Sequence, residues 1–203
     1  MSEIAIIDYG LGNLYSIYKA FAYQEIPARL TDQPKSLKEA SAIVLPGVGA
    51  FEDGMKGLND RGFTEEVIRF AATGKPVLGI CLGMQMLMDE SLEMGQHKGL
   101  GLIPGRVIPF ENNKEKPIKI PHMGWNEVKG FTTSPEMYYF VHSYYVQPKN
   151  QDHVVGVTEY GSYQFCSIVQ KDNILGFQFH PEKSANAGLA LLKDFSKKTQ
   201  EGL

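Results

Sequence analysis

The chain contains 203 residues, of which 43% are apolar and 21% are charged, and its formal net charge is −3. This length predicts a single domain that spans residues 1–203, with enough apolar residues for a sizeable core. The small negative charge gives no electrostatic basis for binding nucleic acid. No apolar run approaches the roughly 20 residues that span a bilayer, and the N-terminus lacks the features of a signal peptide, so we expect a cytoplasmic protein without a membrane partner. The two cysteines are too few for a disulfide framework.

Predicted buried strands and helices alternate through roughly the first 90 residues, a pattern typical of repeated strand–helix units. Continuous apolar runs at 4–7, 41–45 and 76–80 predict strands of a parallel sheet, because such strands are covered on both faces. Apolar residues at helical spacing follow these runs, and Thr64 precedes acidic residues as a helix N-cap does. The predicted helices lie within residues 14–21, 63–74 and 82–88.

Short extended pieces separated by polar turns make up the middle of the chain. They predict antiparallel pairing, with a small second sheet on the same domain. A buried strand at 174–179 and an amphipathic helix around 189–195 close the chain. Together the elements predict an α/β fold, in which a mostly parallel central sheet is flanked by helices and accompanied by a small antiparallel sheet. The extended pieces are 106–110, 117–120, 126–128, 137–141, 154–158 and 164–169.

A cysteine between two glycines, directly after the third strand and directly before a helix, is the strongest functional signal. The segment reads Gly79-Ile80-Cys81-Leu82-Gly83. A strand-to-helix elbow of this kind holds a nucleophile in a strained conformation, and the glycines avoid clashes around it. We therefore predict that Cys81 is a nucleophile and that the amide N–H of Leu82 faces a developing oxyanion. The alternative role, a buried structural cysteine, is the interpretation that we adopt for Cys166, which lies inside an apolar strand.

A cysteine nucleophile needs a base, and His180 ends the last buried strand. Because the carboxyl ends of parallel strands share one edge of a sheet, Cys81 and His180 can meet there. Glu182 follows across Pro181, at a spacing that lets its carboxylate orient the imidazole and stabilise the imidazolium. The sequence predicts a Cys81–His180–Glu182 triad, although a polar exit from a strand would leave the same local pattern.

The loop Pro46-Gly47-Val48-Gly49 follows the second buried strand and should lie at the same sheet edge. Its glycines allow it to present a backbone N–H, so Val48 is the predicted second oxyanion donor. An ordinary turn would have the same composition.

Four segments together resemble the class I, triad-type glutamine amidotransferases, and the match covers nearly the whole chain: residues 46–49, 79–85, Val141-His142-Ser143-Tyr144 and residues 176–182. Six segments in the right order narrow the similarity to the glutaminase subunits of imidazole glycerol phosphate synthases, which serve histidine biosynthesis. The resemblance implies a flavodoxin-like amidotransferase fold. The six segments are Asp8-Tyr9-Gly10-Leu11-Gly12-Asn13-Leu14, Pro46-Gly47-Val48-Gly49-Ala50-Phe51, Cys81-Leu82-Gly83-Met84-Gln85, Gly99-Leu100-Gly101-Leu102-Ile103-Pro104-Gly105, Pro121-His122-Met123-Gly124-Trp125-Asn126 and Phe179-His180-Pro181-Glu182-Lys183-Ser184.

The resemblance implies that the chain hydrolyses glutamine to glutamate and ammonia. Acyl transfer through a cysteine needs neither a metal nor an organic cofactor, so none is expected. The resemblance assigns Glu93 to the amino group of the glutamine. The other residues that it assigns to the substrate are Gly49, Gln85, Ser143 and Tyr144.

A partner protein is also implied by the resemblance, namely a (β/α)8 cyclase that forms a heterodimer with the chain and receives the ammonia through a channel. The glutaminase core already uses the length of the chain, which leaves no room for a domain that binds an acceptor substrate. Trp125 would belong to the docking face, although a core aromatic is the competing interpretation. The docking candidates are Asn13, Met123, Trp125 and Lys183.

Three other functions stay open from the sequence. The chain could be the glutaminase subunit of another synthase, such as anthranilate synthase, although Met84, the Gly47-Val48-Gly49 loop and the segment 121–126 argue against it. It could be an unrelated cysteine hydrolase that uses the same elbow. It could also be a non-enzymatic nucleotide-binding module, but Tyr15 stands where the third glycine of a dinucleotide-binding loop belongs.

Overall fold

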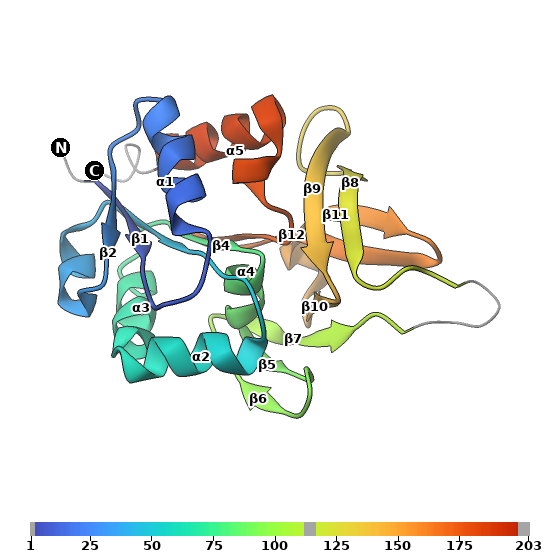
Figure 1. Cartoon of the computed structure of the whole chain (residues 1–203), viewed down its shortest axis with the longest axis horizontal. Coiled ribbons are helices and arrows are strands. Elements are labelled where there is room, and N and C mark those ends of the chain that lie inside the picture. Colours follow the sequence, from blue (N-terminus) through green and yellow to red (C-terminus); the bar gives the residue numbers. More distant parts are fainter. Residues whose placement is uncertain (1–2, 112–116, 199–203) are drawn as a thin grey trace.

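The computed structural model describes residues 3–111 and 117–198. A large sheet carries helices on both faces, and a separate two-stranded sheet packs beside it (Figure 1). The predicted α/β architecture is thereby confirmed. The helices of the described part are α1 (Leu14–Tyr23), α2 (Phe51–Asp60), α3 (Phe63–Ala71), α4 (Leu82–Met86) and α5 (Ala185–Lys198), with the 3₁₀ helices η1 (Pro34–Glu39), η2 (Gln151–His153) and η3 (Pro181–Lys183).

Parallel strands form one half of the large sheet. The strands β1, β3, β4 and β13 are buried along their whole length. Their apolar side chains point alternately to the two faces, so each strand contributes to the core on both sides. In spatial order the parallel strands are β2 (Ala28–Thr31), β1 (Ile4–Ile7), β3 (Ala42–Leu45), β4 (Val77–Ile80) and β13 (Ile174–Phe177).

The other half of the large sheet is mostly antiparallel, and it takes in segments that we expected in the small sheet. Because β12 pairs with the free edge of β13, it carries the later strands outward from the parallel half. Among the described strands only β8 (His122–Val128) and β9 (Glu136–His142) form the separate sheet, and residues 117–120 form no strand. Beyond β13 the order is β12 (Tyr163–Lys171), β10 (Tyr144–Pro148), β7 (Ile103–Pro109), β5 (Met88–Ser91) and β6 (His97–Lys98), with β11 (Val154–Tyr160) paired to β12.

Two apolar clusters lie on the opposite faces of the parallel strands. Phe21 of α1 and Leu192 of α5 pack in the cluster that contains Val44 of β3. On the other face, Val67 of α3 packs in the cluster that contains Ile43 of the same strand. Figure 1 shows α1 and α5 above the strands and α2 and α3 below them. The sheet is therefore closed to water on both faces, and polar chemistry is confined to its edges.

The start of α3 and the end of α4 differ from the boundaries that the sequence predicts. The N-cap of α3 is Gly62, with φ +74°, because the chain leaves α2 through a left-handed turn; Thr64 is already helical and its hydroxyl donates to Asn59 Oδ1 at 2.6 Å. The helix α4 ends at Met86 rather than near Met88. The helix stops there because the carbonyl of the next residue, Leu87, accepts hydrogen bonds from the N–H groups of Leu102 and Ile103 at the start of β7. The chain then continues as β5.

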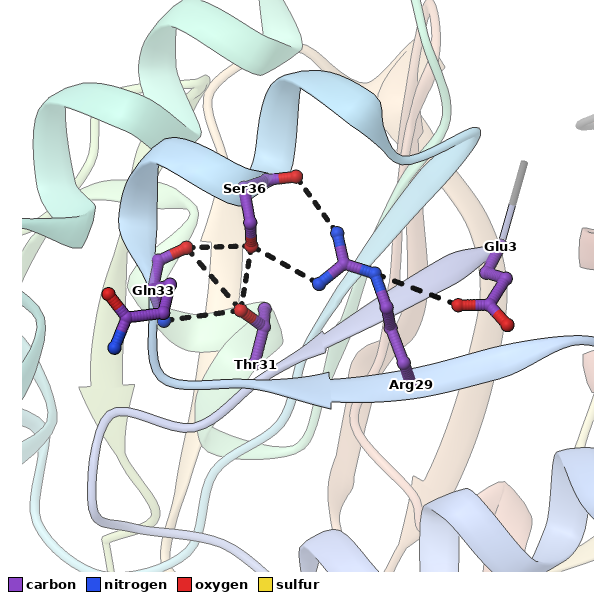
Figure 2. Close-up of polar contacts among 5 residues, drawn as sticks. All are labelled: Glu3, Arg29, Thr31, Gln33 and Ser36. Carbon is purple, nitrogen blue, oxygen red and sulfur yellow. Dashed lines mark hydrogen bonds and ion pairs between the residues drawn. The ribbon is translucent and has the colours of Figure 1, made fainter.

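The guanidinium of Arg29 ties the edge strand β2 to the helix η1 (Figure 2). Its Nη1 donates to Ser36 Oγ at 3.2 Å and its Nη2 donates to Ser36 O at 2.9 Å, while Nε lies 3.8 Å from Glu3 Oε2. Thr31 Oγ1 lies 2.7 Å from the same Ser36 hydroxyl, and the Gln33 carbonyl accepts from it at 2.8 Å. These contacts hold η1, which connects β2 to β3, close to β2 and to the residue before β1.

No helix within residues 3–111 and 117–198 has both the length and the apolar composition needed to cross a membrane.

The elbow between β4 and α4 is packed too tightly for side chains at its glycines. A Cβ atom at Gly83 would lie 1.8 Å from the carbonyl oxygen of Leu45, and one at Gly79 would lie 2.7 Å from the backbone nitrogen of Met84. Real Cβ atoms do not approach backbone atoms so closely, so both positions require glycine. The clash-avoiding role that we predicted for these glycines is confirmed.

We predict that Gly83→Ala lowers the free energy of unfolding by more than about 3 kcal/mol, because the backbone of β3 or α4 must move to admit the methyl group. The matched control is Gly74→Ala, where φ is +80° but a Cβ meets nothing within 4 Å. At Gly74 an alanine is strained only by the left-handed backbone conformation, so we expect the free energy of unfolding to fall by about 1 kcal/mol. Urea unfolding followed by circular dichroism measures both losses; equal losses would show that the elbow is not tightly packed.

Candidate active site

Three neighbouring parallel strands end level at one edge of the large sheet. Leu45 of β3 pairs with Gly79 of β4, and Ile80 of β4 pairs with Phe177 of β13. The chain therefore leaves all three strands at the same place, where the crevice of an open α/β sheet lies. The predicted functional residues that follow these ends are Val48, Cys81 and His180.

Cys81 has a backbone conformation that residues other than glycine rarely adopt, with φ +54° and ψ −110°. Its N–H donates to the carbonyl of Phe177 at 2.7 Å, and its own carbonyl accepts from the N–H of Gln85 at 3.2 Å, which begins α4. The side chain is buried, with 6% of the residue exposed. Strand pairing on one side and the helix on the other hold this strained turn, so the sulfur has a fixed direction.

His180 and Glu182 form a buried pair behind the sulfur. Glu182 Oε1 accepts from Nδ1 of His180 at 2.8 Å, and both side chains are almost completely buried. The backbone of His180 is held as well, because its N–H donates to Tyr139 O at 2.9 Å and its carbonyl accepts from Ser184 Oγ at 2.6 Å. With Nδ1 occupied by the carboxylate, Nε2 is the atom that faces Cys81.

The imidazole of His180 favours the charged form. Burial opposes that charge, but the contact with Cys81 and the hydrogen bond to Glu182, with the negative charge of both groups, outweigh it and raise the pKa of His180 to about 10. Among the described residues Nε2 makes no hydrogen bond of ordinary geometry, and Cys81 is a neighbouring group that favours its charged form. The site is therefore built for an imidazolium beside the sulfur at neutral pH.

A pocket of about 490 Å³ opens over Cys81. The side chain of Glu93 is fixed at this pocket because its Oε2 accepts from the N–H of Phe51 at 2.7 Å, at the start of α2. Glu182 contacts the pocket only through His180. The residues that line the pocket include the predicted oxyanion donors and substrate contacts Val48, Gly49, Leu82, Gln85, Glu93, Ser143 and Tyr144, together with Met94, Pro121, Val141 and His142, for which we predicted no role.

The side-chain amide of Gln85 has one orientation. Its Nε2 donates to Tyr144 O at 3.0 Å and to Gln178 Oε1 at 3.2 Å, so both of its hydrogens have protein acceptors. Its Oε1 is therefore the atom that remains to accept a hydrogen bond from a ligand. A sequence motif alone does not reveal this distinction, since it depends on two residues from distant strands.

Two buried histidines, His122 and His142, were not predicted as a functional pair. His142 Nδ1 lies 2.8 Å from Tyr144 O, His122 Nδ1 lies 3.0 Å from His142 Nε2, and Asn126 Nδ2 lies 3.2 Å from His122 Nε2. Because a carbonyl only accepts, each Nδ1 carries the proton and each Nε2 accepts, which fixes one direction for the whole chain. The two residues are brought together by the register of β8 and β9, which pairs His122 with His142, and the sequence alone carries no signal for that register.

Burial keeps both histidines neutral. It lowers the pKa of His122 to about 4. Burial also lowers the pKa of His142 to about 3, assisted by the nearby His122 and His180 and opposed by the hydrogen bond to the Tyr144 carbonyl. The neutral His142 therefore donates a hydrogen bond to the Tyr144 carbonyl, and His122 in turn donates to His142.

The four docking candidates lie in exposed or partly exposed positions. Met123 and Trp125 are 57% and 51% exposed on β8, so Trp125 is not a core aromatic. Tyr139 pairs with Trp125 in β9, and the Nζ of Lys183 lies 6.0 Å from the centroid of the Tyr139 ring, which places these three side chains together. Asn13 is the N-cap of α1, which contacts η3, the 3₁₀ helix that contains Lys183.

The second cysteine is not among the residues that line the pocket. Cys166 is buried in β12, its Sγ approaches Ile168 O at 3.3 Å, and burial raises the pKa of its thiol to about 12. The interpretation as a core residue is confirmed. Within the described ranges, no cluster of three or more His, Cys, Asp or Glu side chains has the arrangement of a metal site.

Comparison with known proteins identifies related chains over nearly the full length. The family model for glutamine amidotransferase class-I matches residues 5–199. A protein named imidazole glycerol phosphate synthase subunit HisH, from Syntrophotalea carbinolica, is 46% identical over 203 residues, which cover 95% of this chain and 98% of that protein. The protein of the same name from Sulfurimonas denitrificans is 47% identical over 204 residues, which cover 96% and 97%.

Solved structures agree in fold. A crystal structure described as a glutamine amidotransferase superimposes with a TM-score of 0.77 at 17% identity and covers 97% of this chain and 98% of its own. A glutamine amidotransferase from Thermotoga maritima superimposes with a TM-score of 0.62 at 18% identity and covers 99% and 85%. At such low identity these likenesses show the fold alone.

We predict that His122 and His142 stay neutral, with the proton on Nδ1, down to about pH 5. The folded chain then binds fewer protons than the unfolded chain below about pH 6.5, so the free energy of unfolding falls by a few kcal/mol as the pH drops from 6.5 towards 4. Imidazole ¹⁵N spectra of the labelled chain measure the tautomers. Titration of either ring near pH 6.5 would contradict the buried neutral pair, and the double variant His122→Gln/His142→Gln should lose most of the acid dependence.

Proposed function

The chain belongs to the class-I glutamine amidotransferase family, and we propose that it is the glutaminase subunit of an imidazole glycerol phosphate synthase, which hydrolyses glutamine at Cys81 and passes the ammonia to a cyclase partner. The observation that carries this proposal is the arrangement of Cys81, His180 and Glu182 at the level ends of β4 and β13. The relatives' names support the histidine-pathway assignment, because two of them at 46% and 47% identity carry it over nearly their full length.

The chemistry begins with the thiolate form of Cys81, which the neighbouring His180 imidazolium favours. The sulfur attacks the carboxamide carbon of glutamine and forms a C–S bond, while the electron pair of the C=O bond moves to oxygen. The Nε2 proton of His180 passes to the amide nitrogen, the C–N bond breaks, and ammonia leaves a glutamyl thioester. Neutral His180 then takes a proton from water, whose oxygen attacks the thioester and releases glutamate with Cys81 restored.

Glu182 acts through His180 and does not reach the substrate. Its carboxylate accepts a hydrogen bond from the Nδ1–H of His180, with 2.8 Å between Nδ1 and Oε1, so it selects the orientation in which Nε2 faces the sulfur and stabilises the imidazolium. The oxyanion of both tetrahedral intermediates is assigned to the backbone N–H groups of Val48 and Leu82, two residues that line the same pocket as Cys81. Each such donor is worth roughly 3 kcal/mol in enzymes where it has been removed.

The remaining lining residues fit the α-amino and α-carboxylate groups of glutamine. Glu93 supplies a negative charge at the pocket, and Gln85 presents only an acceptor, so both suit the ammonium group. Backbone or hydroxyl groups of Gly49, Ser143 and Tyr144 then remain for the carboxylate. A substrate held by its backbone at these points would extend its carboxamide towards Cys81.

A partner is proposed because released ammonia is useful only if an acceptor captures it. We assign the docking face to Trp125 and Lys183, which both lie against the ring of Tyr139, to the exposed Met123 on the same strand as Trp125, and to Asn13 at the start of α1. Exposed aromatic and methionine side chains of this kind are enriched at protein interfaces. The proposed partner is a (β/α)8 cyclase that forms a heterodimer with this chain and receives ammonia through a channel.

We predict that glutamate release from glutamine appears when the purified chain is mixed with the cyclase and its nucleotide ligand, and that Cys81→Ala lowers it by at least about 10³-fold. Glu182→Gln should lower turnover by roughly 10²-fold or more, with the Michaelis constant little changed, because the imidazole loses its orientation and its charge partner. The assay is coupled to glutamate dehydrogenase. Turnover retained by Cys81→Ala in the verified complex would sink the proposed function.

The oxyanion loop is tied to the core by Tyr9. Its hydroxyl donates to the Pro46 carbonyl at 2.7 Å, immediately before Gly47 and Val48, and it is buried beneath the loop. A Cβ at Gly47 would lie 2.7 Å from the same hydroxyl. We propose that this bond holds the loop in its resting orientation, from which the partner must turn it for full activity.

We predict that Tyr9→Phe raises glutamate release by the isolated chain about fivefold, the population shift expected from losing one hydrogen bond of about 1 kcal/mol. Turnover in the liganded complex should stay within about twofold. Tyr160→Phe is the matched control, because its hydroxyl also donates to a backbone carbonyl, that of Lys119, far from the loop. Unchanged turnover of isolated Tyr9→Phe would show that Tyr9 does not restrain the loop.

A further inference from the structure

The sulfur of Cys81 has a polar neighbour that the triad does not include. Nε2 of Gln178 donates to Sγ at 3.8 Å, and Gln178 is completely buried. Its backbone N–H donates to Ser167 O at 2.9 Å, between the end of β13 and the strand β12. A buried primary amide at this position is directed at the reacting atom by the sheet itself.

The orientation of the Gln178 amide is set by its other end. Oε1 of Gln178 accepts from Gln85 Nε2 at 3.2 Å, and the second hydrogen of that nitrogen goes to the Tyr144 carbonyl at 3.0 Å. Because Gln85 presents a donor to Gln178, the Gln178 atom that faces Gln85 is the oxygen and the atom that faces the sulfur is the nitrogen. The same carbonyl also accepts from the Nδ1 of His142 at 2.8 Å, so the whole arrangement is anchored in the neutral histidine pair.

We infer that Gln178 is a further catalytic residue, which donates an N–H hydrogen bond to the thiolate of Cys81 and shares its stabilisation with His180. The inference rests on the proposed function, because it requires Cys81 to be the nucleophile. Sulfur is a weak acceptor as a thiol and a stronger one as an anion, so the bond strengthens when the thiolate forms.

A second contact of the sulfur acts in the opposite sense. Cys81 Sγ lies 3.9 Å from the carbonyl oxygen of Val141, a contact that is favourable only when the sulfur carries a proton to donate. The thiol is therefore supported by Val141, and the thiolate is supported by Gln178 and His180. Gln178 has a specific task in this balance, because its N–H is not transferred during the reaction and can donate to the thiolate both before the attack on glutamine and when the C–S bond of the thioester breaks.

The test is the pH dependence of alkylation of Cys81 by iodoacetamide in the full chain, measured by mass spectrometry of the Cys81 peptide. We expect Gln178→Met, which keeps the volume and removes the donor, to move the lower limb of the profile to higher pH by about one unit. At a pH below the midpoint this is a roughly tenfold slower reaction. In the complex, kcat/KM for glutamate release should fall by a similar factor.

Ser167→Ala is the control for a general loss of packing. Ser167 is completely buried, its carbonyl accepts from the N–H of Gln178, and its hydroxyl donates to Thr158 and not to Cys81. Its alkylation profile should superimpose on that of the unaltered chain. The role of Gln178 would be overturned if the alkylation profile of Gln178→Met also superimposed on that of the unaltered chain. If Cys81→Ala were inactive in the same experiments, the proposed function would stand. Turnover retained by Cys81→Ala would instead remove the proposed function.

If Gln178→Met does not fold, the hydrogen bond from Gln178 to the Cys81 thiolate can be tested on the unaltered chain. The side-chain N–H signals of Gln178, assigned in a ¹⁵N-labelled sample from their contacts with Gln85, should shift through the pH range in which alkylation accelerates. One of the two hydrogens should move and the other should not, because only one faces the sulfur. Signals that stay fixed throughout that range would overturn the inference.

Discussion

The close approach of the first turn of α4 to the end of β3 is the constraint on which the rest of the site depends. The carbonyl of Leu45 occupies the space that any side chain at residue 83 would need. Because the helix starts so near the sheet, the chain has to turn within Cys81 itself, and this turn gives that residue its φ of +54°. Hydrogen bonding to Phe177 then aligns the turn with β13, the strand that delivers His180. Backbone packing, before any choice of catalytic side chain, thus brings the sulfur and the imidazole together.

A second constraint is the direction of hydrogen bonds beneath the pocket. The Tyr144 carbonyl accepts from His142 on one side and from Gln85 on the other, so it sets the tautomers of the histidine pair and the amide orientation of Gln85 at once. Gln85 in turn sets the orientation of Gln178. Buried polar networks are stable when every member is satisfied, and a change at one member then reaches the others. The wall of the pocket is therefore one hydrogen-bonded unit, although its members come from α4, β8, β9, β10 and the end of β13.

The sequence predicted those parts of the fold that depend on local pattern. Apolar runs located β1, β3, β4 and β13, since strands buried on both faces have no polar alternation to confuse with helix. The pairing of the middle strands was not predictable, because the sequence pattern of β12 suits either sheet. In the structure β12 belongs to the large sheet because it pairs with the free edge of β13. The N-cap of α3 was misplaced at Thr64 because a left-handed Gly62 replaced side-chain capping. In the site, the approach of Cys81 to His180 followed from strand ends, whereas the contact of Gln178 depends on the amide of Gln85, which sequence spacing does not encode.

The network around Arg29 has a consequence for behaviour at high protein concentration. An unpaired edge strand is a template on which another copy of a chain can add a strand, and long apolar edges lead to aggregation. Here one end of the large sheet is β2, four residues long, with the guanidinium of Arg29 held over it by Ser36 of η1. The opposite end is β6, which has only two residues. Both ends of the main strand order are thus short, and one of them carries a held charge, which disfavours the addition of a strand from a second copy at these two ends.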